Sequence, residues 1–251
     1  MASASLDLNT AARSRTQAQS CVILQPSYIP WRGYFHQIQK ADLFVFYDDV
    51  QYDDRGWRNR NRIKTRAGSK WLTIPVAAKG AQVKSIPIDE VHICWDRDWA
   101  KDHLKSFQHN YAHAPYFDIY EPLLKEWFGR RPDRLADFTI ETTIELAHEL
   151  GIETTRFLRS SELECLGSKT DRLLNILMAL GAKHYISGPS AKDYLEVEKL
   201  AQHGISVEWM SYDYPDYPQL FPPFDPFVSV LDLLMNTGPR ASTHIWQQSQ
   251  R

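Results

Sequence analysis

The chain of 251 residues has few cysteines, almost no net charge and no long apolar run. Its three cysteines, Cys21, Cys94 and Cys165, lie far apart and form no C-x-x-C pair. This spacing excludes a disulfide framework and a cysteine zinc site, and it indicates a reducing cytoplasm. A formal charge of −2 argues against broad nucleic-acid binding, which needs a strong basic excess. Because no run approaches the ~20 apolar residues of a membrane span, we expect a cytoplasmic protein with no membrane span and no nucleic-acid partner.

The composition is that of a globular protein with many aromatic residues. An apolar content of 43% and a charged content of 24% are typical of a domain with a proper core. Eight Trp and twelve Tyr suit a pocket lined by rings with a polar handle, so the expected partner is a small molecule. We expect a disordered leader over residues 1–20, a single domain over 21–238 and a flexible tail over 239–251. No feature indicates a cofactor or an oligomeric state.

The alternation of strands and helices predicts an α/β fold with a largely parallel sheet. Residues 22–24 and 43–47 read as strands joined by a loop (25–32) and a helix (34–41), which is a parallel crossover. Later strands are expected at 155–158, 184–187 and 206–210, and helices at 168–181, capped by Ser168, at 191–203 and at 229–236. A β-hairpin (59–65 and 70–76) and a helical insertion (about 95–150) separate the two halves.

In such sheets, ligands bind where loops leave the carboxyl ends of the strands. Asp48 and Asp49 follow a strand at that end and can bind a sugar or amine, act as a base, or hold a metal. The alternative is a pair of loop carboxylates that bind nearby arginines. Gln25 and Tyr28 lie in the proline-stiffened loop 25–32, which is either a binding loop or a structural cover for the core.

Residues 58–66 alternate cations with other residues. In a strand, Arg60 and its neighbours two residues apart share one face, and Asn59 and Asn61 lie on the other. The cations are Arg58, Arg60, Arg62, Lys64 and Arg66. They form either a cradle for a phosphate or carboxylate, since Arg binds such groups in a bidentate manner, or a solvated strand that charge protects from aggregation.

The remaining candidates are weaker. Lys192 follows Ser187-Gly188-Pro189, a turn that attracts anions but lacks the Walker A spacing, so an ordinary helix start is the alternative. His103 is either a general base in a cleft or a satisfied histidine. His109 and His113 have no third ligand, so we expect no metal site. There is no G-x-S-x-G elbow, and we identify no nucleophile.

Taken together, the sequence resembles the WbqC-like protein family. The resemblance covers residues 22–238 and rests on an ordered series of blocks. Among them are Gln25-Pro26-x-Tyr28-x-Pro30-x-x-Gly33-Tyr34-Phe35, Asp42-x-Phe44-Val45-x-x-Asp48-Asp49-Val50-Gln51-Tyr52, Gly56-Trp57-x-Asn59-Arg60-Asn61-x-Ile63 and Tyr185-x-Ser187-Gly188-Pro189. The main departures from the family pattern are Trp31 and Arg32 and the longer leader.

The resemblance implies a role in building bacterial surface glycans such as O-antigen, in which some members are described as glycine or aminoacyl transferases to amino sugars. We therefore expect a transferase that forms an amide on a nucleotide-linked or carrier-linked amino sugar. Asp49 or His103 would be the base, and Gln25, Tyr28, Asp48, Asn59, Arg60, Asn61 and Lys192 would bind substrate. The alternatives are a nucleotidyl- or adenylyl-transferase and a non-catalytic protein that binds a glycan precursor.

Overall fold

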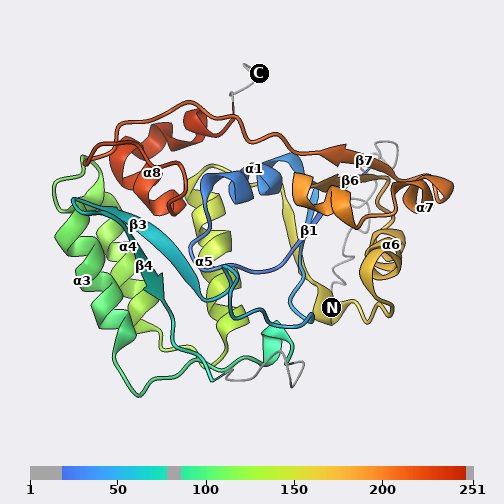
Figure 1. The fold of residues 1–251 in the computed structure, drawn as a ribbon, viewed down its shortest axis with the longest axis horizontal. Helices are drawn as coiled ribbons and strands as arrows, with labels where there is room; N and C mark the ends of the chain where they lie inside the picture. The colour runs from blue at the N-terminus through green and yellow to red at the C-terminus, as the bar shows by residue number, and fades with distance from the viewer. Residues whose placement is uncertain (1–18, 78–85, 247–251) are drawn as a thin grey trace, which may run out of the picture.

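The structure is a computed structural model that describes residues 19–77 and 86–246 (Figure 1). Its centre is a five-stranded parallel sheet with the strand order β5-β2-β1-β6-β7, so the predicted α/β fold is confirmed. The leader expected over residues 1–20 lies almost wholly outside the described residues. The strands are β1 (Ser20–Leu24), β2 (Leu43–Phe46), β5 (Arg156–Arg159), β6 (His184–Ser187) and β7 (Ser206–Trp209).

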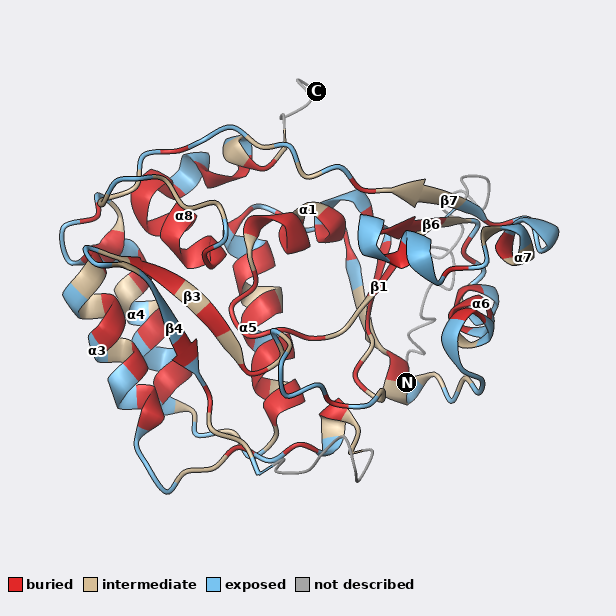
Figure 2. Cartoon of the chain, in the orientation of Figure 1, coloured by how far each residue is buried: buried red, intermediate tan, exposed pale blue. Residues whose placement is uncertain are grey.

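The sheet is covered on both faces because apolar side chains on successive strand residues point to opposite sides. Val22 and Phe44 pack into one core, and Cys21 and Ile23 pack into the other. The first core includes α1 (Arg32–Lys40), α3 (Trp99–Tyr111), α4 (Phe117–Gly129), α5 (Leu135–Glu149) and α8 (Val230–Thr237). The second includes α6 (Lys169–Ala179) and α7 (Val197–Gln202). In Figure 2, buried residues dominate β1, β6, α5 and α8, β7 is mostly of intermediate burial, and exposed residues mark the outer faces of α3 and α6.

The hairpin consists of β3 (Arg60–Thr65) and β4 (Gly68–Thr73), which pair antiparallel as predicted. Gly68 adopts φ 108° at the turn, a conformation that favours glycine. On β3, Asn61 and Ile63 are buried. The hairpin lies at the α3 and α4 end of the molecule, away from β7 (Figure 1).

Two helix starts differ from the expectation. Residues 191–203 are not one helix: a 3-10 helix, η3 (Pro189–Asp193), precedes α7. The helix is interrupted because the Thr170 hydroxyl accepts a hydrogen bond from the Glu196 N–H, 3.2 Å away. Ser168 precedes α6, but its side chain forms no capping hydrogen bond. Its carbonyl instead accepts the Arg172 N–H.

Three further 3-10 helices complete the described chain. They are η1 (Ile88–Glu90), η2 (Ser160–Glu162) and η4 (Gly238–His244). η4 lies in the segment expected as a flexible tail, and Ala241 and Ile245 there are buried in the first core. Within residues 19–77 and 86–246, no helix is both long and apolar enough to cross a membrane.

Candidate functional site

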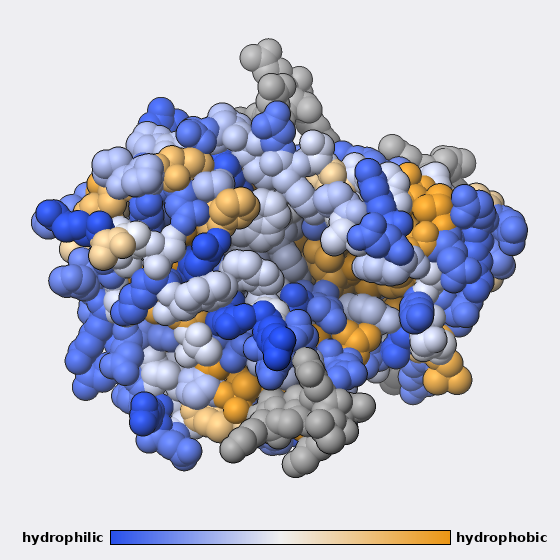
Figure 3. Space-filling model, in the orientation of Figure 1, coloured by the Kyte–Doolittle hydropathy of each residue, from blue (hydrophilic) through white to orange (hydrophobic). Residues whose placement is uncertain are grey.

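A cavity of about 760 Å³ lies at the carboxyl ends of β1 and β6. Gln25, directly after β1, and Gly188, directly after β6, both line it. These strands are neighbours, yet the chain leaves β1 towards β2 on the other side. Such a reversal of strand order leaves a crevice in which ligands of open α/β sheets bind. Figure 3 shows a hollow with hydrophobic residues in its depth, in the region where Figure 1 places β1.

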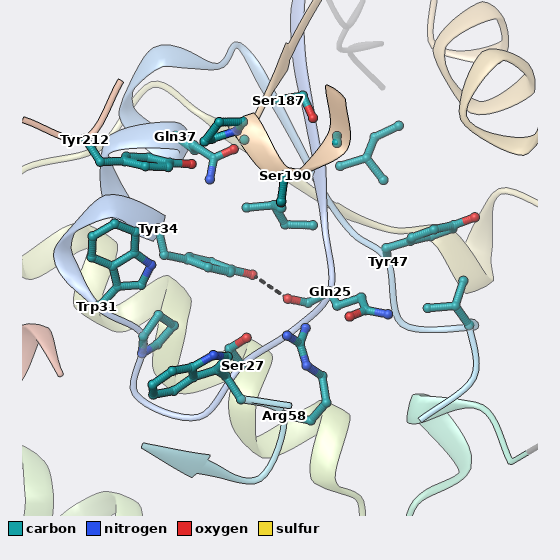
Figure 4. Close-up of a pocket in the computed structure, with 18 of the residues that line it drawn as sticks. Gln25, Ser27, Trp31, Tyr34, Gln37, Tyr47, Arg58, Ser187, Ser190 and Tyr212 are labelled. Atoms are coloured by element: carbon teal, nitrogen blue, oxygen red, sulfur yellow. Dashed lines mark hydrogen bonds between the residues drawn. The ribbon is translucent and has the colours of Figure 1, made fainter. Parts of the chain in front are cut away.

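One wall of the cavity is the start of α1. Trp31, Tyr34 and Gln37 all line it, and Figure 4 shows the Tyr34 ring between Trp31 and Gln25. The Tyr34 hydroxyl donates to the Gln25 carbonyl at 3.1 Å, which fixes the loop after β1. A Cβ on Gly33 would lie 2.4 Å from the Trp31 ring. Glycine at this position therefore lets the indole fold back over the helix.

The opposite wall is the turn from β6 into η3. In Figure 4 the Ser190 side chain points into the space between this turn and α1. Tyr212 also lines the cavity, and its hydroxyl lies so close to Gly188 that an added Cβ there would be 3.2 Å from it. Burial raises the pKa of Tyr212 to about 12, so this hydroxyl is a neutral hydrogen-bonding group at physiological pH.

Arg58 brings a positive charge into the cavity. Its guanidinium points towards Gln25 (Figure 4), and its Nη1 donates a long hydrogen bond of 3.3 Å to the Pro26 carbonyl. Its Nε is buried and has no hydrogen-bond partner. Among the described residues, no carboxylate lies within ion-pairing distance of it. Burial lowers the pKa of Arg58, although an arginine stays charged at pH 7.

The polar groups around the cavity are of types that can form hydrogen bonds with a ligand. They are amides, hydroxyls and two cations, from Gln25, Gln37, Asn61, Ser27, Ser187, Ser190, Tyr34, Tyr47, Tyr185, Tyr194, Tyr212, Arg58 and Lys169. The rest of the lining is apolar or aromatic, including Leu24, Trp31, Trp57 and Phe227. A mostly apolar cavity of this size with a few convergent polar groups is typical of a small-molecule site.

Of the residues predicted to bind substrate, Gln25 and Asn61 line the cavity. The Asn61 amide donates to the carbonyls of Tyr28 (3.0 Å) and Ile29 (2.8 Å). Ile29 has φ 37°, an uncommon backbone conformation for a β-branched residue. Asn61 therefore holds the loop after β1 in shape, and both of its amide hydrogens are used in doing so.

Tyr28 and His103 form a buried pair beneath that loop. The Tyr28 hydroxyl and His103 Nδ1 lie 2.8 Å apart, and the rings stack with centroids 5.6 Å apart. Burial lowers the pKa of His103 to about 4, so the imidazole is neutral at pH 7. Neither residue is part of the cavity lining described above.

Asp48 and Asp49 lie after β2, where arginine and serine side chains bind them. Asp48 is fully buried and accepts hydrogen bonds from Arg159 Nε at 2.6 Å, from the Ser160 hydroxyl and from the Ser161 N–H. Asp49 accepts from the Ser160 hydroxyl at 2.6 Å and forms an ion pair with Arg172. Asp49 precedes Val50, which lines the cavity, but its own side chain points into this cluster.

The other predicted residues lie further from the cavity. The Asn59 amide donates to the Ile74 carbonyl at 2.8 Å. Arg60 stacks on Trp71, with its Cζ 4.8 Å from the ring centroid, and donates to the carbonyls of Gly56 and Arg55. Lys192 is exposed, and its Nζ lies 5.6 Å from the Trp209 ring.

Among the five alternating cations, Arg60 was the one predicted to bind substrate, whereas the cavity lining includes Arg58 and not Arg60. Arg58 precedes β3 and lines the cavity, whereas Arg60 and Arg62 stack on indole rings. Lys64 donates to the Pro223 carbonyl. The signal that sets Arg58 apart is its position just before the strand, next to Gly56-Trp57. Trp31, Tyr34, Gln37, Ser190 and Tyr212 were not identified as candidates, because they become neighbours only when the sheet assembles.

No cluster of three or more His, Cys, Asp or Glu side chains suited to a metal ion occurs in the part of the chain that the structure describes. Asp48 and Asp49, which are potential oxygen ligands, bind arginines and serines instead.

The fold and the cavity define an α/β protein with helices on both faces of a parallel sheet and a ligand-sized crevice at its switch point. The sequence model of the WbqC-like protein family matches residues 25–244, and the chain belongs to this family. Over 228 residues it is 40% identical to the uncharacterized protein Rv1507c of Mycobacterium tuberculosis, a match that covers 89% of this chain and 96% of that protein. No solved structure matches the chain.

Proposed function

We propose that the protein is a cytoplasmic transferase that modifies an amino sugar during the assembly of bacterial surface glycans, by transfer of an acyl or aminoacyl group. The substrate is a small molecule, linked to a nucleotide or a carrier, whose anionic group binds at Arg58. The family to which the chain belongs supports the biological setting. The position, size and lining of the cavity support binding of such a molecule.

The observation that carries this proposal is the guanidinium of Arg58, which has no described carboxylate within ion-pairing distance and interacts with Asp53 only at longer range. Charges removed from water in proteins are generally paired, because an unpaired one loses solvation without compensation. Arg58 lacks such a pair among the described residues, and its Nε is buried without a hydrogen bond. A phosphate or carboxylate of the substrate would supply the missing charge and accept bidentate hydrogen bonds.

In the proposed reaction, the amine of the sugar attacks the acyl carbon of the donor. An N–C bond forms, the bond from the acyl carbon to the leaving group breaks, and the amine loses one proton. A cavity that holds both reactants in line accelerates this step without a covalent enzyme intermediate. Asp49 is the proposed proton acceptor, and it would have to exchange its contact with Ser160 or Arg172 for one with the amine.

The test uses the purified full chain, UDP-glucosamine and a panel of activated acyl and aminoacyl donors, with mass spectrometry of the sugar. We expect a mass gain that corresponds to one acyl group over many turnovers. Arg58→Gln should weaken binding of UDP-glucosamine at least tenfold in calorimetry, since a charge-assisted hydrogen bond contributes about 1.5–3 kcal/mol. Arg58→Lys keeps the charge and should lose less. If wild type and Arg58→Gln bind UDP-glucosamine with equal affinity, Arg58 does not bind the anionic group of the substrate.

A non-catalytic protein that binds a glycan precursor is the second candidate. It is favoured by the polar lining, in which the described groups are amides, hydroxyls and cations rather than carboxylates or imidazoles. Tight binding of UDP-glucosamine without turnover with any donor would support it. Asp49→Asn separates the candidates further: it should abolish transfer if Asp49 accepts the proton, and it should leave binding within about twofold. Magnesium-dependent binding of ATP or CTP would instead indicate a nucleotidyl-transferase.

A further inference from the structure

Three large aromatic side chains are exposed together beside the cavity. Trp57 is 41% exposed, Trp71 is 45% exposed and Phe227 is 60% exposed. Trp57 and Phe227 also line the cavity, whereas Trp71 lies outside its lining on β4. The three side chains, called here the aromatic rim, are therefore continuous with the cavity. Exposed aromatic clusters of this kind mark binding sites in proteins.

The aromatic rim is held in place by arginines. The rings of Trp57 and Trp71 lie 5.1 Å apart at an angle of 37°. The Cζ of Arg62 lies 5.7 Å from the Trp57 ring, 5.5 Å from the Trp71 ring and 5.7 Å from the Phe227 ring. Cation–π contacts of this type orient rings that would otherwise move freely in water. The surface is therefore preorganised, which reduces the entropy that binding would cost.

The surface combines apolar faces with hydrogen-bond donors. Arg62 provides guanidinium N–H groups between the rings, and its Nε has no hydrogen-bond partner. Arg60 adds a second guanidinium over Trp71. A hydrocarbon chain would desolvate these charges without compensation. A pyranose ring suits them, because its C–H groups can pack on an aromatic face while its hydroxyl oxygens accept hydrogen bonds at its edge.

We propose that the aromatic rim binds a pyranose ring of a saccharide that extends out of the cavity. This inference rests on the proposed function, in which the anionic part of the substrate lies at Arg58. The rim then recognises the sugar next to that part, with Trp71 as the stacking face furthest from the cavity. The proposal predicts that the protein prefers substrates that carry more than one sugar.

The test measures calorimetric affinities for two kinds of probe. Chitosan trimer, cellotriose and maltotriose test the rim, and inorganic pyrophosphate tests Arg58. Trp71→Ala should weaken the best trisaccharide at least tenfold and leave pyrophosphate within twofold, since Trp71 does not line the cavity. Arg58→Gln should weaken pyrophosphate binding at least tenfold and leave the trisaccharide affinity within twofold. Trp71→Phe keeps a ring and should retain most of the trisaccharide affinity. Ile119→Ala, at an exposed apolar residue on α4, is the matched control and should change neither affinity.

Two results would overturn the proposal: no trisaccharide binds the wild type, or Trp71→Ala binds the best one within twofold of the wild type. Circular dichroism checks that Trp71→Ala is folded. If it is not, Phe227→Ala, which removes the most exposed ring from a loop, must show the tenfold loss instead. The proposed function fails on different evidence, namely pyrophosphate affinity that Arg58→Gln does not change, or absence of transfer. After either result, the trisaccharide affinities still test whether the aromatic rim binds a sugar.

Discussion

Two charged regions lie at the same end of the parallel sheet and differ in how their charges are satisfied. After β2, Asp48 and Asp49 bind Arg159 and Arg172, and serine hydroxyls occupy further lone pairs. At the cavity after β1 and β6, Arg58 has a single long hydrogen bond to a carbonyl. The carboxylates of the first region are in ion-pairing contact with arginines, whereas Arg58 has no carboxylate in such contact and is affected by Asp53 only at longer range.

The comparison shows that the position of a charged group at the carboxyl ends of strands does not identify a binding residue. Both regions meet that criterion, and both keep a buried arginine Nε without a hydrogen bond, at Arg172 and at Arg58. They differ in that Arg172 forms an ion pair with Asp49, whereas no described carboxylate lies within ion-pairing distance of Arg58. Buried polar groups without partners cost free energy, so the proposed role of Arg58 in binding can be tested through stability as well as through affinity. Three predictions test this difference, from the largest expected effect on stability to the smallest.

The largest effect is expected at Asp48. Asp48→Ala removes the buried acceptor of Arg159 Nε and of the Ser161 hydroxyl, and it should lower the free energy of unfolding by about 3–5 kcal/mol. Urea denaturation measures this change. Asp137→Ala is the control, because Asp137 binds the same arginine at 2.7 Å but is more exposed, and it should cost under about 1 kcal/mol. Equal losses would mean that burial of the pair is not what stabilises this region.

The next effect concerns the pH dependence of stability through His103. Its pKa is about 4 in the folded protein and about 6.5 when unfolded. The unfolded state therefore binds more protons between these values, and stability is lost as the pH falls from 6.5 to 4. The loss attributable to His103 should reach about 3 kcal/mol. His103→Gln removes the titrating group, so its stability should fall less over this range. Parallel curves for the two proteins would contradict the assignment.

The smallest effect on stability is expected at Arg58. Arg58→Gln removes a charge without an acidic partner, so the free energy of unfolding should stay unchanged or rise by up to about 1 kcal/mol. Arg159→Gln is the matched contrast, since it leaves Asp48 buried without its cation and should cost about 3 kcal/mol. Denaturation of both variants in urea measures the difference. A clear loss for Arg58→Gln would show that the guanidinium stabilises the fold and is not reserved for a ligand.

Much of the fold was predictable because it follows from local patterns. The apolar run of β2 and the hairpin arms of β3 and β4 are visible as periodicity, and the family resemblance is confirmed by the match over residues 25–244. The interruption between η3 and α7 was not predictable, because it depends on a hydrogen bond from Glu196 to Thr170 on another helix.

The candidate site was predictable only in part. Gln25 and Asn61 were expected, and they line the cavity. Asp48, Tyr28 and His103 looked equally suitable, but their side chains form buried contacts with one another or with arginine and serine. Residue type and strand position are visible in a sequence, whereas the partner of a polar group is decided by which distant elements pack against it.

The sequence by itself determined the class of fold and the family, and it predicted a site at the end of the sheet where the cavity lies. Hydrophobic periodicity, turn residues and the order of strands and helices are properties of neighbouring residues. The tertiary structure decided which charges are paired and which are not. It placed Arg58 beside Gln25 with no described carboxylate in ion-pairing distance, and it brought Trp57, Trp71 and Phe227 together beside the cavity. These relations join residues up to 170 positions apart along the chain, and only the packing of the folded chain sets them.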